Sequence, residues 1–324
     1  MNILIFGGAG FIGSNLIERL IDNHKIICVD NLLTGRLKNI DKFINNENFL
    51  FINKDITDNL ARTNIEFEIE NFFNRQLDEI YNLACPVSPK KYQINPLHTI
   101  YTCFSVDWMC SLAKKYNAKF LHSSTSEVYG DPDIEHIPQS EIYKGNVNCI
   151  GPRSCYDEGK RIAKTIIYEW TKLGVNSKVI RIFNTYGPNM DPEDGRVISN
   201  FICQALSNKD ITIYGDGSIT RSFQYIDDLL DAIDLVMHVT NDNFHGPVNI
   251  GNTGEFTIKE LAELVLELLP DSKSKIVYLD SVIDDPKQRR PNTSLAFNIL
   301  NGWVPKVNLK EGVINTITYF RKEI

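Results

Sequence analysis

Tyr156 and Lys160 have the residue types and the spacing for proton transfer. They lie four positions apart in the segment SCYDEGK, residues 154–160, so a helix would place both on one face. A tyrosine normally loses its proton at about pH 10, and a neighbouring ammonium group stabilises the phenolate. The pair therefore predicts a base that takes the proton of a substrate hydroxyl while hydride leaves the same carbon. By itself, the spacing is equally typical of two exposed residues on a surface helix.

A second polar segment, SSTSEVYG at 123–130, directly follows a predicted strand at 119–122. Parallel sheets bind their ligands at the carboxyl ends of the strands, which is where this segment lies. Thr125 or Ser126 is expected to form a hydrogen bond with a reacting hydroxyl or carbonyl group. Glu127 is expected to serve as an acid, a base or an orienting group. The alternative interpretation is a serine-rich loop with a solvated glutamate.

Three glycines near the start of the chain predict a binding site for a dinucleotide, which would accept the hydride. Gly7, Gly10 and Gly13 follow an apolar run at 2–6 and introduce a helical pattern at 11–21. Glycines at this spacing let the backbone turn tightly and approach a pyrophosphate, and the helix N-terminus offers unpaired N–H groups. The order of strand, glycine turn and helix favours a dinucleotide site over a turn of structural use alone.

Asp30 adds the adenosine end of this predicted site. It ends the next strand pattern, twenty residues after Gly10. A carboxylate there accepts hydrogen bonds from the ribose hydroxyls and repels a 2′-phosphate. The sequence therefore predicts NAD in preference to NADP, and Arg36 is the nearby cation that could bind a 2′-phosphate instead.

Strand and helix patterns alternate through the first part of the chain. Strands are expected at 2–6, 25–29, 49–53, 79–83, 119–122 and 178–183, and helices at 11–21, 58–75, 96–116 and 153–173. This alternation predicts an α/β fold, a Rossmann-like doubly wound parallel sheet covered on both faces. We expect residues 1–183 to form the NAD-binding domain, including the helix that carries the tyrosine and lysine. Residues 184–324 are expected to form a smaller C-terminal α/β substrate-binding region, with or without a strand that returns to the main sheet.

Composition disfavours several other classes of protein. The 324-residue chain has a net charge of −7, so we expect neither nucleic acid nor a membrane surface as a partner. No signal peptide is recognised, and no apolar run approaches the roughly 20 residues of a membrane helix. The seven cysteines and six histidines are scattered without metal-ligand spacing, which predicts no metal site and favours a reducing cytoplasm.

Longer segments of the chain resemble the extended short-chain dehydrogenases that modify nucleotide sugars, the NAD-dependent epimerase/dehydratase family. Within that family the resemblance is to the UDP-glucuronate decarboxylases, or UDP-xylose synthases. The segments are STSEVYG (124–130), GPRSCYDEGKR (151–161), RIFNTYGP (181–188), DGRVISNFICQA (194–205), TRSFQY (220–225) and DDPKQRRP (284–291).

The resemblance implies a reaction in three parts. NAD oxidises the sugar at C4, which makes the C6 carboxylate part of a β-keto acid. Carbon dioxide then leaves through an enolate, and the NADH returns hydride to C4. The nucleotide cofactor is therefore reused within one turnover.

The resemblance also implies roles for individual residues. Thr125, Ser126 and Glu127 would surround C4 and C5, Tyr156 and Lys160 would form the hydride-transfer pair, and Arg289 would assist the loss of carbon dioxide and contact the substrate. The substrate diphosphate or the cofactor end would be held by Asn184, Arg196, Asn200 and Arg221, since guanidinium groups suit phosphate oxygens. Further cofactor contacts are expected from Phe11, Ile12, Asn31, Thr34, Gly35, Asp55, Ile56, Leu83 and Thr102.

The chain also departs from the decarboxylase pattern. It has an extra helical segment at about 62–76, and Tyr-Thr-Cys at 101–103 stands where the family has Lys-Thr-Asn. The helix that follows, 104–115, is one residue shorter and bears Asp107 and Trp108, and Cys85 replaces a usual serine. These departures fall in the region that should select the sugar.

Two other activities remain open on the sequence. A nucleotide-sugar 4,6-dehydratase shares the C4 oxidation, but many dehydratases have an Asp-Glu pair where this chain has Ser126 and Glu127. The GDP-mannose dehydratases, which have Ser or Thr followed by Ser-Glu, keep that alternative open. A 4-epimerase needs only the loss and return of hydride. A catalytically inactive NAD sensor is disfavoured because Thr125, Tyr156 and Lys160 are all present.

A homodimer is expected by analogy with these enzymes, which commonly pair two helices from each subunit. The helices at 96–116 and 153–173 have apolar residues on more than one face, which is compatible with a buried partner.

Overall fold

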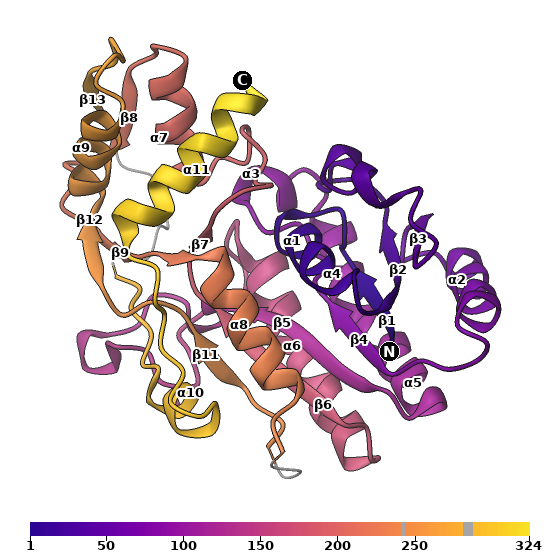
Figure 1. The fold of residues 1–324 in the computed structure, drawn as a ribbon. Coiled ribbons are helices and arrows are strands. Elements are labelled where there is room, and N and C mark those ends of the chain that lie inside the picture. The colour runs from indigo at the N-terminus through magenta and orange to yellow at the C-terminus, as the bar shows by residue number, and fades with distance from the viewer. Residues whose placement is uncertain (241–243, 281–287) are drawn as a thin grey trace. The chain divides into compact units, whose positions relative to one another are not determined.

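The computed structural model of the protein describes residues 1–240, 244–280 and 288–324 (Figure 1). The chain forms two compact units, between which it passes several times. The first contains Met1–Val128, Asn148–Arg181 and Ile233–Pro247, and the second contains Tyr129–Val147, Ile182–Ala232 and Val248–Ile324. Of the segment DDPKQRRP at 284–291, residues 284–287 lie outside the described residues.

The main sheet has seven strands in the order β11-β6-β5-β4-β1-β2-β3, which confirms the predicted Rossmann-like α/β fold. These strands are β1 (Asn2–Phe6), β2 (Lys25–Asp30), β3 (Phe49–Asn53), β4 (Glu79–Asn82), β5 (Lys119–Thr125), β6 (Ser177–Ile182) and β11 (Val248–Ile250). β1 pairs in parallel with β2 on one side and with β4 on the other. The direction of strand addition therefore reverses between β1 and β4, and α/β sheets of this type bind their ligands beyond the carboxyl ends of the strands at such a reversal.

Helices connect the strands of the first unit. They are α1 (Phe11–Leu20), α2 (Asn59–Phe72), α3 (Pro89–Tyr92), α4 (Pro96–Phe104), α5 (Val106–Tyr116) and α6 (Ser154–Lys172), with short 3-10 turns η1 (Leu37–Asn39), η2 (Asp41–Phe43), η3 (Ser126–Tyr129) and η4 (Ile134–His136), the last of these in the second unit. The helix expected over 96–116 is interrupted at Ser105. The Ser105 hydroxyl lies within hydrogen-bond distance of the Tyr101 and Ile56 carbonyls, so its side chain competes with the regular helical pattern at that point.

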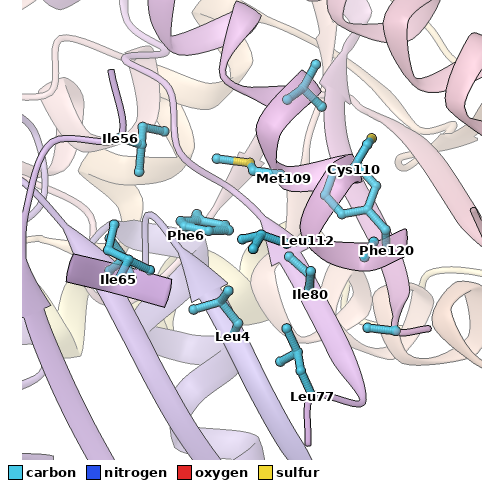
Figure 2. Packing of buried hydrophobic residues seen from close by; sticks show 14 of the residues in the cluster. Leu4, Phe6, Ile56, Ile65, Leu77, Ile80, Met109, Cys110, Leu112 and Phe120 are labelled. Atoms are coloured by element: carbon cyan, nitrogen blue, oxygen red, sulfur yellow. The ribbon is translucent and has the colours of Figure 1, made fainter. Parts of the chain in front are cut away.

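The core of the first unit lies between the sheet and its helices, as Figure 2 shows. Leu4 and Phe6 of β1 pack with Ile65 of α2 and with Met109 and Leu112 of α5. The residues of β1 from Ile3 to Phe6 are completely buried, as expected for a parallel strand covered on both faces. Burial on both faces holds the carboxyl end of β1, and the glycine turn that follows it, in a fixed position.

The second unit contains three two-stranded sheets, β10-β7, β12-β9 and β13-β8. Its remaining elements are β7 (Thr185–Tyr186), α7 (Val197–Leu206), β8 (Ile211–Tyr214), β9 (Thr220–Ser222), β10 (Gln224–Tyr225), α8 (Ile226–Met237), β12 (Glu255–Thr257), α9 (Ile258–Leu268), β13 (Ile276–Leu279), α10 (Ser294–Ile299) and α11 (Leu309–Glu323), of which α8 continues into the first unit. Thr257 and Glu260 form a capping box at the start of α9. Within the described residues, no helix combines the length and the apolar character needed to cross a membrane.

Candidate active site

The turn between β1 and α1 can be built only from glycines at two positions. Gly7 has φ of +78°, and a Cβ atom there would lie 2.7 Å from the backbone nitrogen of Ala84. A Cβ atom on Gly13 would lie 2.3 Å from the Gly7 carbonyl oxygen. The absence of a side chain at Gly7 lets the end of β1 lie against the segment after β4. The absence of one at Gly13 lets α1 lie against the turn. No described side chain caps the N-terminus of α1 at Gly10, so this helix end suits an anion.

Asp30 closes the other side of this turn at the end of β2. Its Oδ2 accepts a hydrogen bond from the Ala9 N–H at 3.1 Å, and its Oδ1 accepts one from the Leu32 N–H at 2.8 Å. Burial raises the pKa of the Asp30 carboxyl, although both backbone hydrogen bonds act in the opposite direction. Gly35 passes so close that a Cβ atom there would lie 2.7 Å from Asp30 Oδ1. The carboxylate is thus fixed beside the glycine turn.

Asp55 joins three segments at the same end of the sheet. Its carboxylate accepts hydrogen bonds from Asn31 Nδ2 at 2.9 Å and from the Thr57 N–H at 2.8 Å, and it lies 2.8 Å from His98 Nε2. Burial alone would raise the pKa of Asp55, but the hydrogen bonds from Thr57, His98 and Asn31 together lower it to about 2. Asp55 therefore fixes the loop after β2 relative to the start of α4.

The other predicted cofactor residues lie in the first unit. Phe11 and Ile12 form the first turn of α1, Thr34 lies in the loop after β2, Ile56 follows β3, and Thr102 lies in α4. Leu83 follows β4, and its N–H donates a hydrogen bond to the Phe6 carbonyl at 2.9 Å. The ends of β1 and β4 are therefore brought together next to the glycine turn.

Tyr156 and Lys160 lie on the buried side of α6. The Tyr156 ring stacks on the Tyr92 ring, with centroids 5.1 Å apart and an interplanar angle of 2°. Lys160 Nζ donates a hydrogen bond to the Ser123 carbonyl at 2.7 Å and lies 6.0 Å from the centroid of the Tyr156 ring. Burial raises the pKa of Tyr156 well above its usual value, as does the nearby Cys85 thiol, whereas a hydrogen bond with Thr125 lowers it. The protein groups as a whole therefore favour the protonated phenol.

The serine-rich segment meets this pair at the end of β5. Thr125 is the last residue of β5 and is buried, as is Ser126, which begins η3. Because Thr125 forms a hydrogen bond with Tyr156, the end of β5 and the start of α6 share one site. The backbone N–H of Glu127 donates to Thr125 Oγ1 at 3.2 Å, which orients the threonine hydroxyl.

Arg153 is a residue of this site that the sequence analysis missed. Its guanidinium forms an ion pair with the Glu127 carboxylate, and its Nε lies 3.9 Å from Asp157 Oδ2. The interaction with Asp157 has i, i+4 spacing and could have been found from the sequence. The contact with Glu127 joins residues 26 positions apart, for which the sequence contains no periodic signal. Tyr92 was missed for the same reason, since it belongs to the short helix α3.

The second unit brings two of the predicted substrate residues together. Arg221 and Arg289 are paired through an isolated parallel β-bridge, and both are buried. Arg196 forms an ion pair with Asp194, and Asn200 Nδ2 donates to the Gly195 carbonyl at 3.0 Å. The Asn184 carbonyl accepts a hydrogen bond from the Gln224 N–H at 2.9 Å. Guanidinium groups suit an anionic ligand, and the role of Arg221 and Arg289 toward a sugar nucleotide stays a prediction.

Residues 3–251 match the model of the NAD dependent epimerase/dehydratase family. The chain belongs to this family. It is 46% identical to UDP-glucuronic acid decarboxylase 1 of Xenopus tropicalis over 325 aligned positions, which cover 99% of this chain and 72% of that protein. Among solved structures, UDP-glucose 4-epimerase of Thermotoga maritima is 29% identical with a TM-score of 0.87, and the match covers 100% of this chain and 99% of that one. UDP-glucuronic acid 4-epimerase of Bacillus cereus, in complex with UDP-glucuronic acid and NAD, is 25% identical with a TM-score of 0.82 and full coverage of both chains.

As a member of the epimerase/dehydratase family, the protein is an NAD-dependent enzyme, as the glycine turn and Asp30 predicted. The residues of the first unit fit this cofactor. The glycine turn brings the backbone to the uncapped N-terminus of α1, which suits a pyrophosphate, and Asp30 offers a fixed carboxylate for a ribose. In the described part of the chain, no cluster of three or more His, Cys, Asp or Glu side chains could hold a metal ion.

Proposed function

We propose that the protein decarboxylates UDP-glucuronate to UDP-xylose, using NAD that is regenerated in each turnover. The observation that carries the proposal is the site at the ends of β5 and α6, where Thr125, Tyr156 and Lys160 meet next to an ion-paired Glu127. The likeness to decarboxylases along almost the whole chain supports the choice of substrate.

Tyr156 is the group that exchanges a proton with the C4 hydroxyl. When bound, NAD supplies the hydride acceptor and donor, together with a positive charge in its oxidised form. Because burial keeps the pKa of Tyr156 high even with Lys160 nearby, the phenol would lose its proton only once the oxidised cofactor adds a further positive charge. Lys160 contributes a second positive charge, and its hydrogen bond to the Ser123 carbonyl keeps it below the ring.

Thr125 and Glu127 act around the reacting carbons. Thr125 holds the C4 oxygen next to Tyr156, since its side chain forms a hydrogen bond with the phenol. Oxidation at C4 weakens the bond to the C6 carboxylate, because the electron pair left by carbon dioxide is delocalised into the C4 carbonyl as an enolate. Glu127 is assigned to the proton exchange at C5.

The second unit binds the remainder of the substrate. Arg221, Arg196, Asn184 and Asn200 hold the diphosphate, and Arg289 contacts the sugar carboxylate and assists its loss. Both arginines are buried and their backbones are joined by a bridge, which supports a preorganised anion site that needs little ordering when a ligand binds.

Product analysis tests the reaction. Incubation with UDP-glucuronate should release carbon dioxide and form a UDP-pentose in mass spectrometry, with catalytic NAD. No turnover at high enzyme concentration would refute the proposal. A UDP-hexuronate of unchanged mass but altered configuration would identify a 4-epimerase, the activity of the solved relatives. A 4-keto-6-deoxy product from UDP-, dTDP- or GDP-hexoses would identify a dehydratase.

Substitution of Tyr156 tests its assigned role. The variant Tyr156→Phe keeps the stacking on Tyr92 but removes the exchangeable proton, so turnover should fall by at least about 100-fold. NAD binding, measured by calorimetry, should change little. Near-normal turnover would remove Tyr156 from the reaction.

We also propose that the protein is a homodimer that pairs α4 and α6 between subunits. Leu97, Tyr101 and Phe104 are 62%, 56% and 46% exposed and have helical spacing along α4, and Tyr168 of α6 is 58% exposed. Light scattering on the purified protein should give twice the chain mass, and Tyr101→Arg should halve it. The free cysteines of the chain further suit a reducing compartment such as the cytoplasm, which cell fractionation would test.

A further inference from the structure

Two thiols from separate elements meet beside the predicted catalytic pair. Cys85 lies in the turn after β4 and Cys103 in α4, and their sulfur atoms are 3.8 Å apart. Cys85 is partly exposed, whereas Cys103 is buried. Cys85 is therefore the more accessible residue of the two.

Both thiols pack against the residues that surround Tyr156. Cys85 packs against the buried cluster formed by Tyr92, Cys155 and Tyr156. Cys103 lies against α6 at Gly159, where an added Cβ atom would come within 3.0 Å of its sulfur. Gly159 immediately precedes Lys160, so the sulfur pair touches the helix segment that carries both predicted catalytic side chains.

The two thiols differ in reactivity. The hydrogen bond between the two thiols lowers the pKa of Cys85 and outweighs the effect of burial, and the charge of Lys160 acts in the same direction. The pKa of Cys103 is raised by the Cys85 interaction and by burial. The thiolate is the reactive form, and Cys85 is both the less buried thiol and the one whose pKa is lowered, so we assign Cys85 as the nucleophile and Cys103 as the resolving partner.

We propose that Cys85 and Cys103 form an oxidative modification site that reacts with a hydroperoxide and closes to a disulfide. The Cys85 thiolate attacks one peroxide oxygen, the O–O bond breaks, and with hydrogen peroxide the leaving hydroxide takes a proton to become water. Cys85 is now a sulfenic acid. The Cys103 sulfur then attacks the Cys85 sulfur and displaces a second water. The two thiols lose two electrons and two protons, and one peroxide is reduced to two waters.

Closure of the disulfide should stop catalysis. A disulfide requires the sulfur atoms to approach from 3.8 Å to about 2.05 Å, so at least one side chain must leave its present packing. Movement of Cys103 opens a gap at Gly159, and movement of Cys85 opens one beside the Tyr156 ring. Either change displaces Tyr156 and Lys160 from their shared geometry. Reduction by a dithiol would restore both thiols and therefore the activity.

Peptide mapping after oxidation tests the site directly. The NAD-loaded protein is treated with increasing hydrogen peroxide, alkylated, digested and analysed by mass spectrometry, and turnover of UDP-glucuronate is followed in parallel. We expect a peptide linked through Cys85 and Cys103, together with a loss of turnover that dithiothreitol reverses. The mapping does not depend on the proposed function, so a missing linkage and a wrong substrate are distinguishable.

Three variants sharpen the result. Cys103→Ser and Cys85→Ser should each abolish the linked peptide. Each variant should also lose the reversible inactivation, judged against the activity of the same variant before peroxide treatment. Cys149→Ser is the matched control, because Cys149 is exposed and outside the pair, and it should respond like the wild type. Oxidation of Cys149 in the wild type while Cys85 and Cys103 stay reduced would overturn the proposal. So would a linked pair with unchanged turnover.

Discussion

Replacing Arg153 with methionine should destabilise the protein and misplace Glu127. The Arg153 and Glu127 side chains are only 18% and 13% exposed, so water compensates little for the loss of their ion pair. Removing one partner of a buried ion pair costs about 3–5 kcal/mol. We expect about 3 kcal/mol here, because both side chains keep some exposure. For a domain the size of the first unit, which contains both residues, this loss of stability corresponds to a decrease in melting temperature of about 6–12 °C.

The effect on catalysis should be separable from the effect on stability. At a temperature where both proteins are folded, Arg153→Met should lower kcat by about 100-fold, since Glu127 loses the contact that orients it. KM should change less than kcat, and Arg153→Lys should recover part of the activity.

A double-mutant cycle with Glu127→Gln measures the coupling between the two side chains. The two single changes and the double change should differ from additivity by about 2 kcal/mol. Lys172→Met is the control on the same helix, because Lys172 pairs with Glu169 in an exposed position, and its melting temperature should match the wild type. Additive effects of the Arg153 and Glu127 changes, or an unchanged kcat in Arg153→Met, would refute the positioning role.

Three further predictions concern substitutions in the first unit. Gly13→Ala should cost about 1–3 kcal/mol of stability and abolish NAD binding in calorimetry, because its Cβ would overlap the Gly7 carbonyl, and retained affinity would contradict this. Asp30→Asn should weaken NAD binding about tenfold and narrow the preference over NADP, which comparative titrations would measure. The pKa of Asp55 is about 2 in the folded protein and below its unfolded value, so its stabilising contribution is complete above about pH 4 and is lost as the pH falls through about 2. Thermal unfolding of Asp55→Asn should therefore lack part of the acid dependence of the wild type, and identical curves would rule out this contribution.

Local spacing was enough to predict the cofactor half of the site. The glycine turn needs particular φ angles and close backbone approach at Gly7 and Gly13, which only one residue type allows. Tyr156 and Lys160 share a face of α6 because four residues make about one helical turn. These features depend on neighbours within a few positions, so the amino-acid order alone contains them.

Other features of the site depend on contacts between distant segments. Arg153 meets Glu127, and Cys85 meets Cys103, without any periodic pattern that links the two partners. The sequence also predicted that a lysine would favour the tyrosinate, whereas burial of Tyr156 reverses the direction of its pKa. Burial is a property of the packed core and cannot be read from the residues next to Tyr156.

The sequence by itself determined the fold class and the NAD cofactor and predicted the proton-transfer pair, because each rests on steric rules and on periods of two to four residues. Tertiary structure alone decided which groups surround Tyr156, how Glu127 is held and that two thiols lie in contact. The physical reason is that solvation, charge pairing and thiol contact act through space, between segments that only the folded sheet and its helices bring together.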